Sequence, residues 1–136
     1  MDTKKTRMIK PRIKYFETGP WPIYLGFTRD ETSFLSEMRR LNIPNPPDFV
    51  TKNADATTHI LSGSGNITLT TIIICVKPSK KHSKEQHTAL VAHEAVHVWW
   101  GVCEAMGGDS HPGGEHEAYG VQWITQVILE ELWKKR

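Results

Sequence analysis

The stretch VAHEAVHVWW, residues 91–100, places two histidines four positions apart, with a glutamate directly after the first, in a run that is otherwise apolar. An ionisable group buried without a partner costs several kcal/mol or loses its charge, and this segment would hold three of them. On a helix, residues four apart lie on one face, so His93 and His97 could bind a single ion. A metal ion is therefore the expected partner of this trio.

The flanking sequence predicts that this stretch lies in the middle of a long helix. Ser83 and Gln86 form a capping-box pattern that starts a helix, and the apolar spacing continues to about Met106. After a glycine-rich loop, the segment from residue 115 onward predicts a second helix. Its apolar positions at helical spacing are Ala118, Val121, Ile124, Val127, Ile128 and Leu132.

The first half of the chain is expected to supply a small β-sheet and one helix. The segments IKYFETG and WPIYLGF are typical of short strands, and residues 31–43 have the spacing of an amphipathic helix. THILSGSGNITLTTIIICVKP predicts a β-hairpin that turns at its glycines. Together these elements predict an α+β fold in one domain over residues 1–136, of which residues 1–11 form a basic arm.

Composition and charge exclude several classes of protein. The chain is 38% hydrophobic and 24% charged, and it contains no run of eighteen apolar residues that could cross a bilayer. No secretory signal is recognisable at the N-terminus, and two cysteines are too few for a disulfide framework, so a cytoplasmic location is expected. The excess of lysine and arginine in the first fourteen residues predicts a solvated arm, and nucleic acid is not an expected partner.

The chemistry expected of the motif H-E-x-x-H is that of a zinc site. His93 and His97 would be two ligands, and a catalytic zinc site takes a third protein ligand and leaves one position open. Glu94 would lie beside the ion, where it could take a proton from water as a general base. The residues alone leave four candidates for the third ligand, which are His111, Glu115, His116 and Glu117.

HEAVH, followed by a glycine-rich loop and EHEAY, resembles the gluzincins, which are HExxH zinc metallopeptidases with a glutamate as third ligand. HEAVHVWW together with GGEHEAYGVQWI is most similar to small zincin peptidases encoded by phages or prophages. The resemblance covers residues 83–130. It implies a minimal zincin-like domain with a small β-sheet, an active-site helix and a C-terminal helix. If the chain is of phage or prophage origin, its location would be the cytoplasm of the bacterial host.

The resemblance also implies roles for individual residues. His93, His97 and Glu115 would bind Zn²⁺, and Glu94 would be the general base. Relatives often carry aspartate where this chain has Tyr119, and the tyrosine is expected instead to hydrogen-bond a ligand or the reacting oxyanion. Glu117, which is nearer the centre of the apolar stripe, stays open as an alternative to Glu115.

The implied function is a zinc-dependent metallopeptidase that hydrolyses peptide bonds in a peptide or protein substrate through a metal-activated water. The alternative is a catalytically weak, zinc-stabilised binding module that keeps the zincin fold. A peptide substrate would lie along a strand beside the metal, and NITLTTIIICV is the segment expected to supply that strand unless it is a central strand of the core. His59, His82 and His87 are expected to be ordinary surface or strand residues, and Trp99 and Trp100 to line the core or a groove wall.

Overall fold

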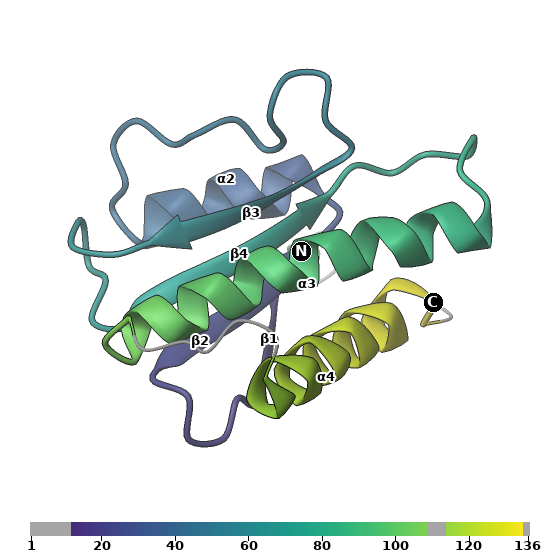
Figure 1. The fold of residues 1–136 in the computed structure, drawn as a ribbon. Coiled ribbons are helices and arrows are strands. Elements are labelled where there is room, and N and C mark those ends of the chain that lie inside the picture. Colours follow the sequence, from purple (N-terminus) through teal and green to yellow (C-terminus); the bar gives the residue numbers. More distant parts are fainter. Residues whose placement is uncertain (1–11, 109–113, 135–136) are drawn as a thin grey trace, which may run out of the picture.

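The computed structural model describes residues 12–108 and 114–134 of the chain. Its strands are β1 (Lys14–Phe16), β2 (Ile23–Thr28), β3 (Ala56–Leu61) and β4 (Thr70–Val76), and its helices are α2 (Glu31–Arg40), α3 (Lys84–Ala105) and α4 (Glu115–Leu132). Helices α3 and α4 cover one face of the sheet and α2 covers the other (Figure 1). The α+β class is confirmed, whereas the zincin-like identity stays a prediction. Among the described helices, none has the length and apolarity needed to span a membrane.

The strand order of the sheet is β1-β2-β4-β3. Strands β2 and β4 are parallel, and the other two pairs are antiparallel. The predicted hairpin is confirmed, since β3 pairs with β4 from Ala56 opposite Val76 to Leu61 opposite Thr71. Because β4 is paired on both sides, the expectation that its segment offers an edge to a peptide is wrong. The strand with an unpaired edge on this side of the sheet is β3.

Strand β4 is apolar from Ile72 to Val76 because both of its faces are covered. Ile72, Ile74 and Val76 are fully buried against α3 and α4, and Ile73 and Cys75 are fully buried on the face covered by α2. This two-sided burial is why the segment shows a continuous apolar run instead of alternation. Burial also raises the pKa of the Cys75 thiol. Neither of the two cysteines, both of which the structure describes, forms a disulfide.

Helix α3 begins as the sequence predicts. Gln86 donates its backbone N–H to Oγ of Ser83 at 3.0 Å, and Ser83 donates its own N–H to Oε1 of Gln86 at 2.7 Å. This reciprocal cap satisfies two of the N–H groups that a helix N-terminus leaves without partners. The helix ends at Ala105 with Met106 as its C-cap, so the motif lies within it as expected.

Helix α4 packs on α3 by a stripe that differs at one end from the predicted one. Its buried residues are Gly120, Ile124, Ile128 and Leu132. Ala118 is exposed, so its place in the apolar stripe was wrong, and Gly120 faces the ring of Trp99 instead. A β-carbon at residue 120 would lie 2.4 Å from Cε3 of Trp99, so only glycine permits this close approach. Trp21 then packs edge-on against Trp99, with ring centroids 5.6 Å apart.

Helix α2 is shorter than the predicted segment, because it ends at Arg40 and not at residue 43. Its N-cap is Asp30, whose carboxylate accepts the backbone N–H of Ser33 at 2.9 Å. Asn42, two residues after the last helical residue, has a φ of +58°, a left-handed conformation that asparagine tolerates better than most residues. The chain therefore leaves the helix before it reaches Pro44.

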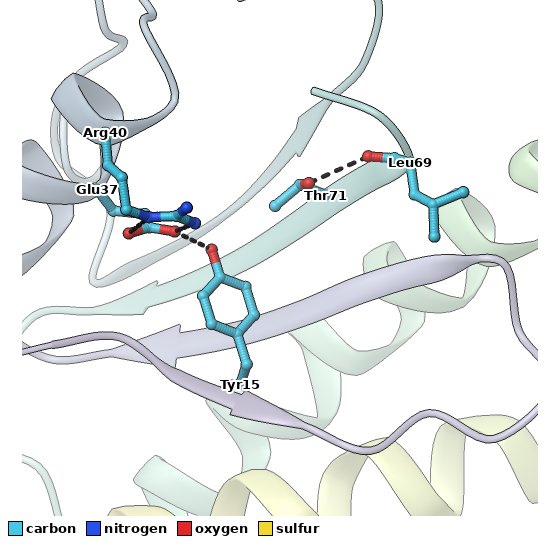
Figure 2. A network of polar contacts seen from close by, with 5 residues as sticks. All are labelled: Tyr15, Glu37, Arg40, Leu69 and Thr71. Atoms are coloured by element: carbon cyan, nitrogen blue, oxygen red, sulfur yellow. Dashed lines mark hydrogen bonds and ion pairs between the residues drawn. The ribbon is translucent and has the colours of Figure 1, made fainter. Parts of the chain in front are cut away.

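A polar network ties the edge strand β1 to α2 (Figure 2). The hydroxyl of Tyr15 donates to Oε2 of Glu37 at 2.5 Å, and Nε of Arg40 donates to Oε1 of Glu37 at 2.9 Å. Burial alone would raise the pKa of Glu37, but the hydrogen bonds from Arg40 and Tyr15 lower it below its ordinary value. Burial and the contact with Glu37 raise the pKa of Tyr15, so its phenol stays protonated. In the same view, Thr71 hydrogen-bonds the carbonyl of Leu69.

Candidate metal centre

The two histidines of the motif converge on one point beside α3. Nε2 of His93 and Nε2 of His97 lie 3.2 Å apart, and the ring centroids are 4.9 Å apart. Two imidazole nitrogens that bind one tetrahedral zinc at 2.0–2.1 Å are separated by roughly 3.3–3.4 Å. The observed separation therefore fits a pair of zinc ligands. Both nitrogens would have to be unprotonated to bind, so each neutral ring would carry its proton on Nδ1.

Glu94 lies next to this pair but points toward the sheet. Its side chain is buried, at 5% exposure, and its Oε1 accepts the hydroxyl hydrogen of Thr58 at 2.7 Å. Thr58 belongs to β3, so a hydrogen bond joins this edge strand to the motif. This bond compensates part of the cost of burying a carboxylate. Glu94 and His93 both line a surface hollow.

The structure does not bring a third ligand to the two histidines. Among residues 12–108 and 114–134, no three His, Cys, Asp or Glu side chains form a group able to hold a metal ion. Glu115 and Glu117 both lie in the first turn of α4, and α4 contacts α3 at Trp99. Trp99 is about 200° around the helix from His97, since an α-helix has 3.6 residues per turn. The role of Glu115 therefore stays a prediction, as does that of Glu117.

Two further residues near the start of α4 that the sequence analysis considered are exposed. Tyr119 is 65% exposed, and His116 is exposed, as expected for a surface residue. His111 lies outside the described residues. The hydrogen bond expected of Tyr119 stays a prediction.

A hollow of about 490 Å³ continues from the motif toward the start of α3. It is lined by Ala54, Asp55, Ala56, His82, Gln86, Ala89, Leu90, His93 and Glu94. His82 was expected to be an ordinary residue, but its Nε2 lies 3.4 Å from the carboxylate of Asp55. Its Nδ1 is buried and has no hydrogen-bond partner among the described residues. The sequence could not predict the contact between His82 and Asp55, because the two residues lie 27 positions apart in different segments.

His59 has a structural role on the opposite face of β3. Its Nε2 lies 2.9 Å from the carbonyl oxygen of Phe49, and its ring stacks on Phe34 at 4.8 Å. Burial lowers the pKa of His59, although the carbonyl and the charge of Glu94 act in the opposite direction. His59 is therefore a neutral histidine of the core and not a ligand.

The two adjacent tryptophans differ in environment, as their positions on the helix require. Trp99 is buried between α3 and α4, whereas Trp100 is 55% exposed. The ring of Trp100 meets that of His97 edge-on, with centroids 5.1 Å apart and an angle of 90°. Trp99 is thus a core residue, and Trp100 lies beside the candidate centre.

Comparison of the chain with protein-family models, with curated proteins and with solved structures finds no match. The resemblance to gluzincins therefore rests on the motifs alone and stays a prediction.

Proposed function

We propose that this protein is a zinc-dependent metallopeptidase that hydrolyses peptide bonds. The observation that carries the proposal is the 3.2 Å separation of the two Nε2 atoms, next to a buried glutamate. His93 and His97 would hold the ion. When bound, zinc would supply Lewis acidity, which lowers the pKa of water and polarises a carbonyl group.

Glu94 is the proposed general base. Thr58 occupies Oε1 of its carboxylate and thereby orients the side chain, which leaves Oε2 to accept a proton from the attacking water. As the peptide bond breaks, Glu94 would pass that proton to the leaving amine. The products would be a free carboxylate and a free amine, without a covalent intermediate.

The unpaired edge of β3 is the proposed docking site for the substrate backbone. An extended peptide can add to a sheet edge by main-chain hydrogen bonds. Strand β3 is at the end of the sheet next to the motif, and its Thr58 contacts Glu94. A peptide paired with β3 would therefore pass close to the histidine pair.

The proposal is tested by comparing zinc-loaded wild type with Glu94→Gln on a peptide library. The amide can still accept the hydrogen bond from Thr58 but cannot serve as a base, so cleavage should fall by at least about a hundredfold. Glu130→Gln, at an exposed position of α4, is the matched control and should cleave like wild type. Absence of zinc-dependent cleavage by wild type, or equal rates for wild type and Glu94→Gln, would contradict the proposal.

A second candidate is a zinc-stabilised binding module with little turnover. One observation favours low turnover: among the described residues no third His, Cys, Asp or Glu side chain joins His93 and His97, so a three-ligand catalytic site is not complete there. Measuring zinc affinity for Glu115→Gln and Glu117→Gln identifies the missing ligand. The true ligand should lose at least about tenfold in affinity, and the other glutamate should not. Loss in neither variant, together with peptide binding without cleavage, would favour the binding module.

A further inference from the structure

Strand β3 and helix α3 run side by side in the same direction. Three contacts fix their register: Ala56 lines the hollow with His93, Thr58 bonds Glu94, and Ile60 packs against Gly101. Gly101 permits this packing, because a β-carbon there would lie 3.0 Å from Cδ1 of Ile60. The motif thus lies midway along the contact between the strand and the helix, and the two ends of this contact can be compared.

The end beyond His97 is apolar. Ile60 is 42% exposed and contacts α3 at the residue that follows Trp100, which is itself 55% exposed. We call Ile60 and Trp100 the apolar shelf. Large apolar side chains exposed next to each other commonly mark a binding surface. The edge-on contact between Trp100 and His97 places this shelf directly beside the candidate centre.

The end before His93 carries polar groups that the apolar shelf lacks. It is the hollow of about 490 Å³, whose polar lining consists of Asp55, His82 and Gln86 in addition to the motif. His82 is held near Asp55, and the buried Nδ1 of His82 has no partner among the described residues. A polar side chain could hydrogen-bond the carboxylate of Asp55, whose side chain is 50% exposed, or the exposed amide of Gln86.

We propose that these two ends select the substrate, an inference that rests on the proposed peptidase function. The substrate is an extended peptide paired antiparallel to β3, because antiparallel pairing is slightly more stable per residue than parallel pairing. Its N-terminal side then lies over the apolar shelf and its C-terminal side over the hollow that holds Asp55 and Gln86. The peptide therefore carries a large apolar side chain immediately before the scissile bond and a polar side chain after it.

The test is digestion of a mixed peptide library by the zinc-loaded full-length protein, with the cleaved bonds identified by mass spectrometry. Wild type should cleave after leucine, isoleucine or phenylalanine. Trp100→Ala should lower kcat/KM for these bonds about tenfold and leave bonds that follow alanine within about twofold. Trp133→Ala, an equally bulky and 41% exposed residue at the far end of α4, is the control and should keep the wild-type preference.

A binding arm separates failure of this inference from failure of the peptidase proposal. Binding of uncleaved peptides to zinc-loaded Glu94→Gln, with and without Trp100→Ala, is measured by calorimetry. If peptides with large apolar side chains bind in a way that depends on Trp100, but wild type cleaves no peptide, the apolar shelf is supported as a binding surface and the peptidase proposal is overturned. Three outcomes would overturn the inference but not the peptidase proposal. Wild type could cleave without an apolar preference, it could prefer the opposite order of side chains, or Trp100→Ala could cleave with the same preference as wild type. Neither cleavage nor Trp100-dependent binding overturns both.

Discussion

Thr58 on β3 donates its hydroxyl hydrogen to Oε1 of Glu94 on α3 at 2.7 Å, across 36 positions of sequence. This bond connects the edge strand β3 with the residue that follows the first histidine of the motif. It both compensates the burial of a carboxylate and restricts its orientation.

Replacing Thr58 by valine keeps the shape of the side chain but removes the donor. The buried carboxylate of Glu94 then loses its partner, so the free energy of unfolding should fall by about 1–3 kcal/mol, as measured by urea denaturation. Thr58→Ser keeps a hydroxyl and should lose much less. Equal stability of the valine and wild-type proteins would show that the bond contributes nothing.

Gly120→Ala separates helix propensity from packing. Propensity alone would stabilise α4 by about 1 kcal/mol, because alanine is the better helix former. The added methyl group would instead meet the ring of Trp99, so we expect a net destabilisation of about 1–3 kcal/mol in thermal unfolding. The exposed substitution Gln122→Ala in the same helix is the control and should change little. A stabilised Gly120→Ala protein would mean that α4 does not pack on α3 as described.

His59 should make stability depend on pH. Burial, partly opposed by the Phe49 carbonyl and the charge of Glu94, holds its pKa in the fold below the value of about 6.5 expected in the unfolded chain. At a pH below this unfolded-state pKa, His59 is protonated in the unfolded chain but stays neutral in the folded protein. The free energy of unfolding is therefore highest above this pH and falls as the pH decreases below it. His59→Gln, whose amide can still donate to the Phe49 carbonyl, should weaken this decrease. Urea unfolding of both proteins at several pH values measures it, and identical pH profiles would contradict a buried neutral His59.

Tyr15→Phe removes one hydrogen bond to Glu37 while Arg40 remains in place. The carboxylate is partly buried, and a hydrogen bond to a charged group contributes more than a neutral one, so a loss of about 1–2 kcal/mol is expected in urea unfolding. Tyr24→Phe changes an adjacent, half-exposed tyrosine and is the control. An unchanged midpoint for Tyr15→Phe would show that the network does not hold β1 against α2.

The features that the sequence predicted correctly depend on local spacing. The cap of α3 needs only Ser83 and Gln86, three residues apart, and the convergence of His93 and His97 follows from the helical period. These signals do not depend on the rest of the fold, which explains why they were reliable.

The features that the sequence did not predict depend on contacts between distant segments. Nothing near Thr58 indicates that it bonds Glu94, and a continuous apolar run cannot reveal that β4 is central while β3 has the unpaired edge. The side of α3 that α4 covers is decided by the close fit of Gly120 on Trp99, so the helical stripe alone misplaced Ala118. For the same reason the motif could not determine where Glu115 lies.

The most direct measurement is the zinc content of the purified, folded protein. Wild type should bind one zinc per chain, and the double variant His93→Ala/His97→Ala should bind none while retaining its circular dichroism spectrum. A control that also removes two histidines, His87→Ala/His116→Ala, should keep the zinc. A wild-type protein that binds no stoichiometric zinc, or a double variant at residues 93 and 97 that binds it equally well, would contradict the proposed metal centre.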